Sequence, residues 1–206
     1  MKFLPFWCGL LLALSPVAVA QGQAQQEPPG LKNTVILIIR HAEKPDTGNG
    51  LSPVGKQRAK AYINYFKNFE VDSQPLKLDC LFAAADSRES HRPRLTLKPL
   101  GQALGLRIND RFKDKQSQEL AREIQSQPPG QHILICWHHG EISQLVRALG
   151  ADPGILLPDA QWPDAAFGWV LQLRYDAEGR LISKETKRIL ENLMPGDVDR
   201  PARPAS

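Results

Sequence analysis

The sequence predicts a single α/β domain built as a three-layer sandwich, with a mostly parallel central sheet and helices on both faces. Three short apolar runs that lack acidic and basic residues are typical of strands buried on both faces, as in parallel sheets. Segments with helical spacing of apolar residues separate these runs along the chain. A length of 206 residues suits one compact domain. In such folds the ligand site lies at the carboxyl ends of the strands.

The two ends of the chain are expected to lie outside this domain. Residues 1–20 have the features of a signal peptide, because a lysine precedes an apolar run and Ala18-Val19-Ala20 offers a cleavage site of small residues. The run is shorter than the ~20 apolar residues that a membrane-spanning helix needs. We therefore expect a periplasmic or secreted protein, cleaved near Ala20. Composition predicts a disordered lead-in over residues 21–33, a domain over residues 34–194 and a disordered tail over residues 195–206.

Charge and cysteine content narrow the partners. The net charge is +4, with Lys and Arg scattered among Asp and Glu. This balance favours a small anionic ligand, and the sequence has no basic stripe of the kind that nucleic-acid binding requires. Cys80 and Cys136 lie in apolar runs and are expected to be free thiols rather than a disulfide or metal ligands. We expect a monomer or a weak dimer, without a cofactor or metal.

The first half of the domain alternates strand, loop and helix. Thr34 to Ile39 is a continuous run of mostly β-branched residues, and it ends at Arg40-His41. A loop rich in Gly and Pro follows, and apolar residues then recur at helical spacing from Val54 to Phe66. The same order repeats, with a strand expected over Cys80–Ala84 and a helix over Pro93–Leu104.

The second half adds one more buried strand and closes with a strand pair. A helix is expected over Ser117–Ile124, a strand over His132–Trp137 and a helix over Glu141–Leu149, which Gly150 ends. The last two strands are expected to be antiparallel, over Phe167–Tyr175 and Leu181–Arg188, with a turn at Asp176–Gly179.

Three polar clusters follow the three buried strands. They are Arg40-His41-Ala42-Glu43, Arg92 to Thr96, and His138-His139-Gly140-Glu141. Each alone is more simply explained by capping or solvated side chains. Together they bring arginines and histidines to one edge of the sheet, and arginine side chains match the oxygens of a phosphate. The sequence therefore predicts an anion site at this edge.

This ordered set resembles the histidine phosphatase superfamily, which includes the phosphoglycerate mutases. The resemblance rests on Arg40-His41 after the first strand, on Arg92 with Thr96, and on His139-Gly140 at a late strand-to-helix turn. It covers most of residues 34–175. The segment after the first cluster, Leu51-Ser-Pro-Val-Gly55 with Gln57 and Ala59, is also similar to the family's.

The first cluster has the form Arg-His-Ala-Glu, and two positions depart from the usual family pattern. Ala42 replaces the glycine that often follows the histidine, and His138 stands where a small Ser or Thr is common. An imidazole at position 138 has the chemistry to bind substrate or to tune the pocket.

The resemblance implies a phosphoglycerate mutase-like fold and a metal-independent phosphatase similar to the histidine acid phosphatases. His41 would be the nucleophile, and Arg40, Arg92 and His139 would bind the phosphate. A phosphoryl group in transfer spreads negative charge over its oxygens, so fixed cations and donors suit it. We expect Arg40 to lower the pKa of His41 and a carbonyl to hold its second ring nitrogen. His139 would also act in catalysis.

The proton donor to the leaving group is less well defined. The family often takes an acidic residue from the segment after the arginine helix, and Asp114 is our preferred candidate there. Five carboxylates are candidates in all: Asp110, Asp114, Glu119, Glu43 and Glu141. Candidate substrate contacts are Lys44, Glu43, His138 and Glu141.

Export favours hydrolysis of a phosphomonoester over a mutase reaction, which needs a retained phosphoenzyme and a cytoplasmic metabolite. A non-catalytic phosphate-binding protein of the same fold is the alternative function. A metal site from His41, His138, His139 and Glu141 is disfavoured, because its spacing matches no familiar zinc motif. A serine hydrolase is disfavoured by the absence of a Gly-x-Ser-x-Gly elbow. Sugar phosphates, nucleotides, phosphorylated glycans and phosphoproteins all remain open as substrates.

Overall fold

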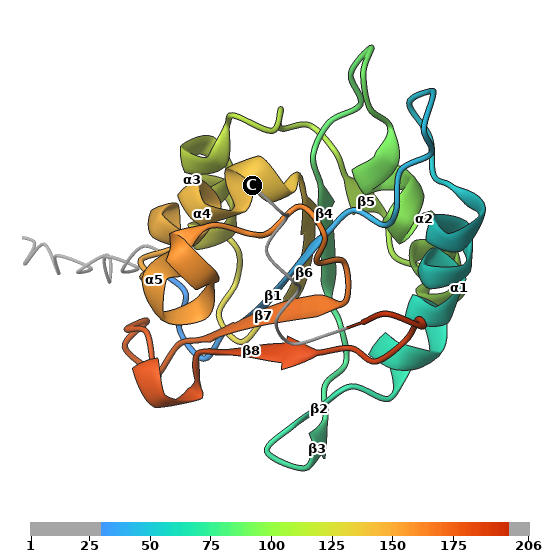
Figure 1. Ribbon diagram of the computed structural model, residues 1–206. Coiled ribbons are helices and arrows are strands. Elements are labelled where there is room, and N and C mark those ends of the chain that lie inside the picture. The colour runs from blue at the N-terminus through green and yellow to red at the C-terminus, as the bar shows by residue number, and fades with distance from the viewer. Residues whose placement is uncertain (1–29, 198–206) are drawn as a thin grey trace, which may run out of the picture.

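The computed structural model describes residues 30–197, which form a three-layer α/β sandwich (Figure 1). Its central six-stranded sheet has the strand order β5-β4-β6-β1-β7-β8. β5, β4, β6 and β1 are parallel, whereas β7 is antiparallel to both of its neighbours. In chain order the elements are β1 (Val35–Arg40), α1 (Pro53–Lys67), β2 (Glu70–Val71), β3 (Gln74–Pro75), β4 (Cys80–Ala83), α2 (Arg92–Leu104), β5 (Ile108–Asn109), α3 (Ser117–Gln125), β6 (His132–Trp137), α4 (His139–Ala148), α5 (Pro153–Leu156), η1 (Pro158–Ala160), β7 (Trp169–Arg174), η2 (Ser183–Glu185) and β8 (Lys187–Leu190).

Helices cover both faces of the sheet, with α1 and α2 on one side and α3, α4 and α5 on the other (Figure 1). Successive side chains of β1 enter the two opposite cores, as the two-residue period of a strand requires. Ile36 and Ile38 pack in the core that α3 and α4 cover, and Leu37 and Ile39 pack in the core that α1 and α2 cover. The predicted sandwich with a mostly parallel sheet is therefore confirmed.

The three predicted buried strands are neighbours at the centre of the sheet, in the order β4-β6-β1. Their register aligns Ala83 with Cys136 and Arg40 with Trp137, so the three strands end at the same edge. The His41 backbone N–H donates to the Trp137 carbonyl at 3.0 Å and extends this pairing by one step. The three polar clusters consequently start from one edge of the sheet.

The start of α1 is pressed against the chain that follows β1. A Cβ added at Gly55 would lie 2.4 Å from the Glu43 carbonyl oxygen, so no other residue fits there without a backbone shift. Ser52 caps the helix by accepting a hydrogen bond from the Gly55 N–H, and its own N–H donates to the Glu43 carbonyl. The segment Leu51 to Gly55 thus fixes the loop that carries the first cluster.

The prediction of a strand over Leu181–Arg188 is wrong in its first part. Leu181 makes one isolated bridge to Tyr175, and the chain then turns through η2 before β8 pairs antiparallel with β7. The Thr186 N–H and hydroxyl both bond the Ile182 carbonyl, so this polar stretch satisfies its own backbone groups instead of pairing with β7.

Several short elements were not predicted. β2 and β3 form a hairpin whose turn residues, Asp72 and Ser73, both have positive φ, as a type I′ turn requires. β5 and α5 are also short, and so give little periodic signal in the sequence. Trp162 and Trp169 are buried in the core.

The folded unit is slightly longer at both ends than the predicted residues 34–194. Leu31, placed in the lead-in, is only 6 % exposed, and Asn33 donates to the Asp176 carbonyl. Asp197, placed in the tail, accepts hydrogen bonds from Arg58. The predicted signal peptide lies outside the described residues. Cys80 and Cys136 are free thiols, as expected. Within residues 30–197, none of the helices is long and apolar enough to span a membrane.

Candidate active site

His41 is buried at the carboxyl end of β1, with 3 % of its surface exposed. Its Nδ1 lies 2.8 Å from the Ala42 carbonyl oxygen. A carbonyl only accepts, so Nδ1 carries the proton and Nε2 keeps its lone pair. Burial, with smaller contributions from the positive charges of Arg40 and Arg92, lowers the pKa of His41 to about 3. The imidazole is therefore neutral at physiological pH and has the tautomer that a nucleophile needs.

The Ala42 backbone is itself held from the neighbouring helix. Its N–H donates to the Thr96 hydroxyl oxygen at 2.9 Å, and that hydroxyl donates to the Arg92 carbonyl at 2.8 Å. Thr96 is fully buried in α2. The second cluster thus fixes the peptide whose carbonyl sets the tautomer of His41.

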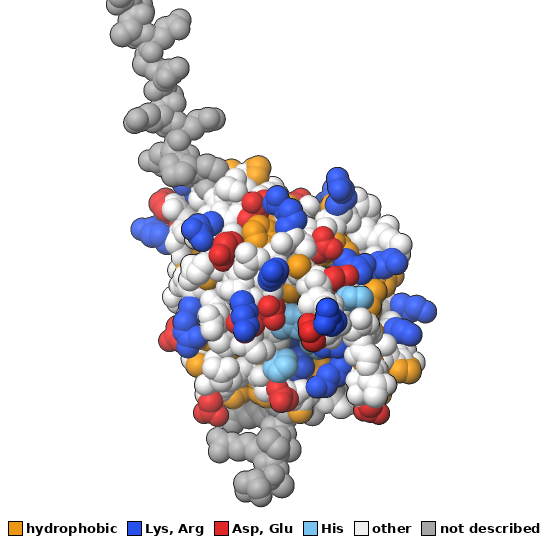
Figure 2. All heavy atoms as spheres, turned by 90° about the horizontal axis from the view of Figure 1, so that it is seen from above, with side chains coloured by type: hydrophobic (Ala, Val, Ile, Leu, Met, Phe, Trp, Pro, Cys, Tyr) orange, Lys and Arg blue, Asp and Glu red, His pale blue; other side chains and the backbone are white. Residues whose placement is uncertain are grey.

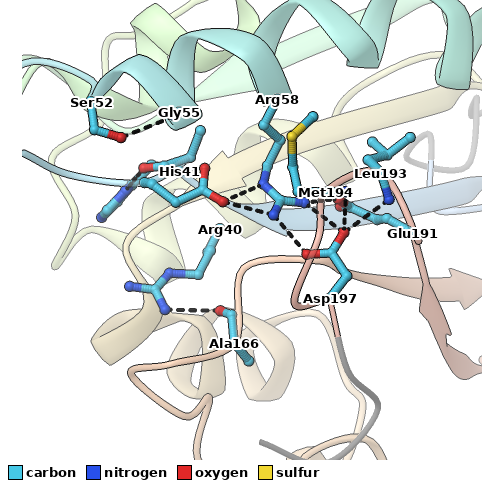
Figure 3. A network of polar contacts seen from close by, with 12 residues as sticks. Arg40, His41, Ser52, Gly55, Arg58, Ala166, Glu191, Leu193, Met194 and Asp197 are labelled. Carbon is cyan, nitrogen blue, oxygen red and sulfur yellow. Dashed lines mark hydrogen bonds and ion pairs between the residues drawn. The ribbon is translucent and has the colours of Figure 1, made fainter.

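Arg40 is 2 % exposed, and its partners within residues 30–197 are neutral groups rather than carboxylates. Its Nη1 donates to the carbonyls of Asp164 at 2.8 Å and Ala166 at 2.9 Å, the latter drawn in Figure 3. The guanidinium also stacks on the Phe167 ring, 3.8 Å from its centroid. Burial without a bonded carboxylate lowers the pKa of Arg40 to about 10, although the charges of Asp164 and Glu43 oppose this shift. Most of its positive charge is left to act on the site.

His139 opens α4 and lies between Arg40 and the loop before β7. Arg40 Nη2 is 3.3 Å from Nδ1 of His139, and Asp164 Oδ1 is 2.7 Å from Nε2. An arginine only donates, so Nδ1 accepts and Nε2–H donates to the carboxylate. Burial lowers the pKa of His139, and the charges of Arg40 and of the exposed Lys44 add to this effect. Asp164 itself is 92 % exposed, so an incoming anion could displace it.

Arg92 is the first residue of α2, and its side chain makes fewer hydrogen bonds to the rest of the described chain than that of Arg40 does. Its one side-chain hydrogen bond, Nη1 to the Gly48 carbonyl, is long at 3.5 Å, and its buried Nε has no partner among the described residues. Its charge nevertheless reaches both His41 and His138. Arg92 therefore has donors to offer an anion beside His41.

His138 lies beside His41, with ring centroids 5.1 Å apart and ring planes at 68°. It is the extended residue between β6 and α4, so its side chain leaves the chain in a different direction from that of His139. Burial lowers the pKa of His138, and Asp114 is the nearby carboxylate that opposes this shift. The structure thus places all three histidines of the clusters around one site.

The five candidate proton donors have different surroundings. Asp114 is the one of the five whose charge acts on His138, and two of the others are bound by arginines. Glu43 is bound by Arg58, and Asp110 lies 3.7 Å from Arg94. Glu119 and Glu141 lie in the first turns of α3 and α4, where a carboxylate interacts favourably with the helix dipole.

Sequence reasoning missed a group of buried charged residues next to the first cluster, in which Arg58 binds three carboxylates. Arg58 is 1 % exposed and bonds Glu43 Oε1 at 2.7 Å, Glu191 Oε2 at 2.9 Å and Asp197 Oδ1 at 2.7 Å. Figure 3 shows its guanidinium directed toward Glu191 and Asp197. The Tyr62 hydroxyl donates to Glu191 from the next turn of α1. The signal was present in the helical spacing, because Arg58 shares the buried face of α1 with Gly55, Tyr62 and Phe66.

The edge of the sheet that carries the site is exposed on one side of the molecule. Figure 2, which views this side from above, shows histidine side chains in the middle of the face among both basic and acidic side chains. Within residues 30–197, no three or more His, Cys, Asp or Glu side chains are grouped so as to hold a metal ion.

Comparisons with known proteins bear on the fold. Neither a family model nor a curated protein matches the sequence. A phosphoserine phosphatase variant from Entamoeba histolytica, solved with phosphoserine, matches with a TM-score of 0.50 and 12 % identity, over 78 % of this chain and 98 % of that one.

Two further solved structures match somewhat less well. A phosphoglycerate mutase from Plasmodium falciparum has a TM-score of 0.47 and 13 % identity, over 85 % of this chain and 98 % of that one. The protein histidine phosphatase SixA, in complex with tungstate, has a TM-score of 0.47 and 16 % identity, over 71 % of this chain and 92 % of that one. At these identities the comparisons concern architecture alone, and the chain shares the α/β-sandwich fold of the phosphoserine phosphatase.

Proposed function

We propose that the protein is a phosphomonoester hydrolase that acts through a phosphohistidine at His41 on a small organic phosphate. The observation that carries this proposal is the state of His41. Its Nδ1 is held by the Ala42 carbonyl, so the lone pair is on Nε2, and the charges of Arg40 and Arg92 act on its ring. A neutral nucleophile next to arginines that bond no carboxylate within residues 30–197 suits attack on a phosphate dianion.

The reaction has two steps. His41 Nε2 forms a bond to phosphorus while the ester P–O bond breaks, and the leaving oxygen takes up a proton. Water then attacks the phosphohistidine and releases inorganic phosphate. Arg92 and Arg40 stabilise the charge on the transferred group, and His139 donates to one of its oxygens after Asp164 moves aside. We infer that the group that donates a proton to the leaving oxygen lies on the same side of the site as Asp114.

Two details, the location of the protein and the absence of a metal, are inferred from the sequence and from the chemistry of the site. The signal-like segment at residues 1–20 supports action outside the cytoplasm, in the periplasm or after secretion. Arginines and histidines supply the cations of the site, which supports a metal-independent mechanism similar to that of the histidine acid phosphatases. Retention of activity in the presence of a chelator tests the latter point.

The experiment is a screen for phosphate release from a panel of monoesters that includes nucleotides, sugar phosphates and phosphopeptides. The wild-type protein should release phosphate from at least one ester, and His41→Ala should lose that activity by about 10³-fold or more, as loss of a nucleophile does. His132→Gln is a matched control, because His132 lies at the other end of β6. Full turnover in His41→Ala would contradict the proposal, and phosphate binding without turnover in the wild type would favour the non-catalytic alternative.

A further inference from the structure

His138 lies within reach of the group that His41 would transfer. The two rings are 5.1 Å apart between centroids and meet edge to face at 68°. Reacting atoms in such a transfer lie about 3–3.5 Å apart, so a phosphate ester bound for attack by His41 lies within a few ångströms of both rings. His138 is only partly buried, so part of the residue is accessible to a substrate.

The groups that face His138 come from four parts of the fold. Arg40 is the last residue of β1, and His41 comes directly after it. Arg92 belongs to α2, His139 to α4, and Asp114 to the loop before α3. Asp114 is the one carboxylate among them. Its position is tied to the same strand end as His138, because the Trp137 Nε1–H donates to the Asp114 carbonyl at 2.9 Å.

These surroundings couple the charge of His138 to substrate binding. In the free site, burial and the neighbouring cations lower the pKa of His138. A bound phosphate dianion adds negative charge opposite those cations and acts in the same direction as Asp114, so it favours the protonated imidazole. The ring would therefore hold a proton when an ester is present to receive it.

Two of the other candidate carboxylates are engaged by arginines. Glu43 accepts from Arg58, and Asp110 pairs with Arg94. Asp114 itself accepts from the Lys115 N–H through Oδ1 at 2.9 Å, which turns this oxygen toward its own loop. A histidine next to the nucleophile is better placed to reach the leaving oxygen than any of these side chains.

We propose that His138 is the proton donor to the leaving oxygen and that Asp114 acts through His138 as a positioning residue; this rests on the proposed function. The His41 Nε2–P bond forms, the P–O ester bond breaks, and the proton of the imidazolium passes to the ester oxygen, which leaves as an alcohol. In the second step water attacks phosphorus, its proton returns to His138, and the N–P bond breaks to release phosphate.

The test compares esters whose leaving groups differ in their need for a proton. p-Nitrophenolate leaves readily without one, whereas an alkoxide such as that from glycerol phosphate does not. In the full chain, His138→Gln should lower kcat/KM for the alkyl ester by about 10²–10⁴-fold, the usual contribution of a general acid, and for p-nitrophenyl phosphate by only a few-fold. Asp114→Asn should show the same split with a smaller loss, and His132→Gln should show none.

The alternative outcomes separate the two proposals. Equal losses for both esters in His138→Gln would overturn the inference, because a purely structural role would affect both alike. A split in Asp114→Asn without one in His138→Gln would also overturn it, since Asp114 would then donate directly. Both outcomes leave the proposed function standing, whereas a wild-type protein that hydrolyses neither ester would overturn the proposed function and this inference together.

Discussion

Two buried arginines, Arg40 in the first cluster and Arg58 in α1, have opposite surroundings. Arg58 bonds three carboxylates and its pKa is raised, so its charge is neutralised where it lies. Arg40 bonds carbonyls and a histidine, and burial lowers its pKa to about 10. The two are almost equally buried, at 1 % and 2 % exposure. The comparison shows that the partners of a buried arginine, rather than its burial, indicate whether its charge is left for a ligand.

The largest effect is expected from Arg58→Met, which should lower the free energy of unfolding by about 3–5 kcal/mol, because the buried carboxylates lose their counter-charge. Equilibrium denaturation measures this change. The matched control is Arg180→Met, since Arg180 also pairs with two carboxylates but is 73 % exposed. The control should leave the free energy of unfolding nearly unchanged, because exposed ion pairs stabilise a fold little. Equal losses of stability in both variants would show that the buried ion pairs of Arg58 contribute no more than exposed ones.

The converse variant, Arg40→Met, should affect catalysis more than folding. We expect kcat/KM for a phosphomonoester to fall about 10²–10³-fold, as when one donor to a developing charge is removed. Its loss of stability should be smaller than that of Arg58→Met, because no carboxylate is left unpaired. Steady-state kinetics and denaturation of the same preparation check both parts. An Arg40→Met protein with unchanged kcat/KM would show that its charge does not serve the substrate.

The smallest effect concerns Asp164, whose exposed carboxylate lies on His139 where a phosphate oxygen would bind. Asp164→Asn removes a negative charge that opposes an incoming anion, a repulsion of about 1 kcal/mol near the surface. Inorganic phosphate should therefore inhibit the variant about fivefold more strongly. Glu178→Gln, in the exposed turn after β7, should leave inhibition unchanged. Weaker inhibition of Asp164→Asn would mean that the carboxylate helps to orient His139 for the anion.

The sequence predicted the parts of the molecule whose signal is local. Continuous apolar runs predicted β1, β4 and β6, and their parallel alignment followed from the helices between them. Because parallel strands end at one edge, the grouping of Arg40, Arg92 and His139 could also be anticipated. The tautomer of His41 followed from chemistry, although burial lowers its pKa more than the expected charge of Arg40 does.

What could not be predicted depends on contacts between distant segments. Glu191 and Asp197 reach Arg58 from more than 130 positions away in the chain, and nothing in their own surroundings in the sequence marks them. Asp164 meets His139 because Arg40 holds the carbonyls of the loop around it. The irregular start of the final strand depends on backbone bonds that the polar residues around Thr186 make among themselves.

The proposed reaction passes through a phosphohistidine at His41, which can be trapped. Wild-type protein should be mixed with an ester labelled in its phosphate, quenched in base and digested, so that the labelled peptide can be identified. The account predicts an acid-labile, base-stable label on the peptide that contains His41, absent from His41→Ala and present in His132→Gln. Release of phosphate with no such label, or a label on another residue, would contradict it.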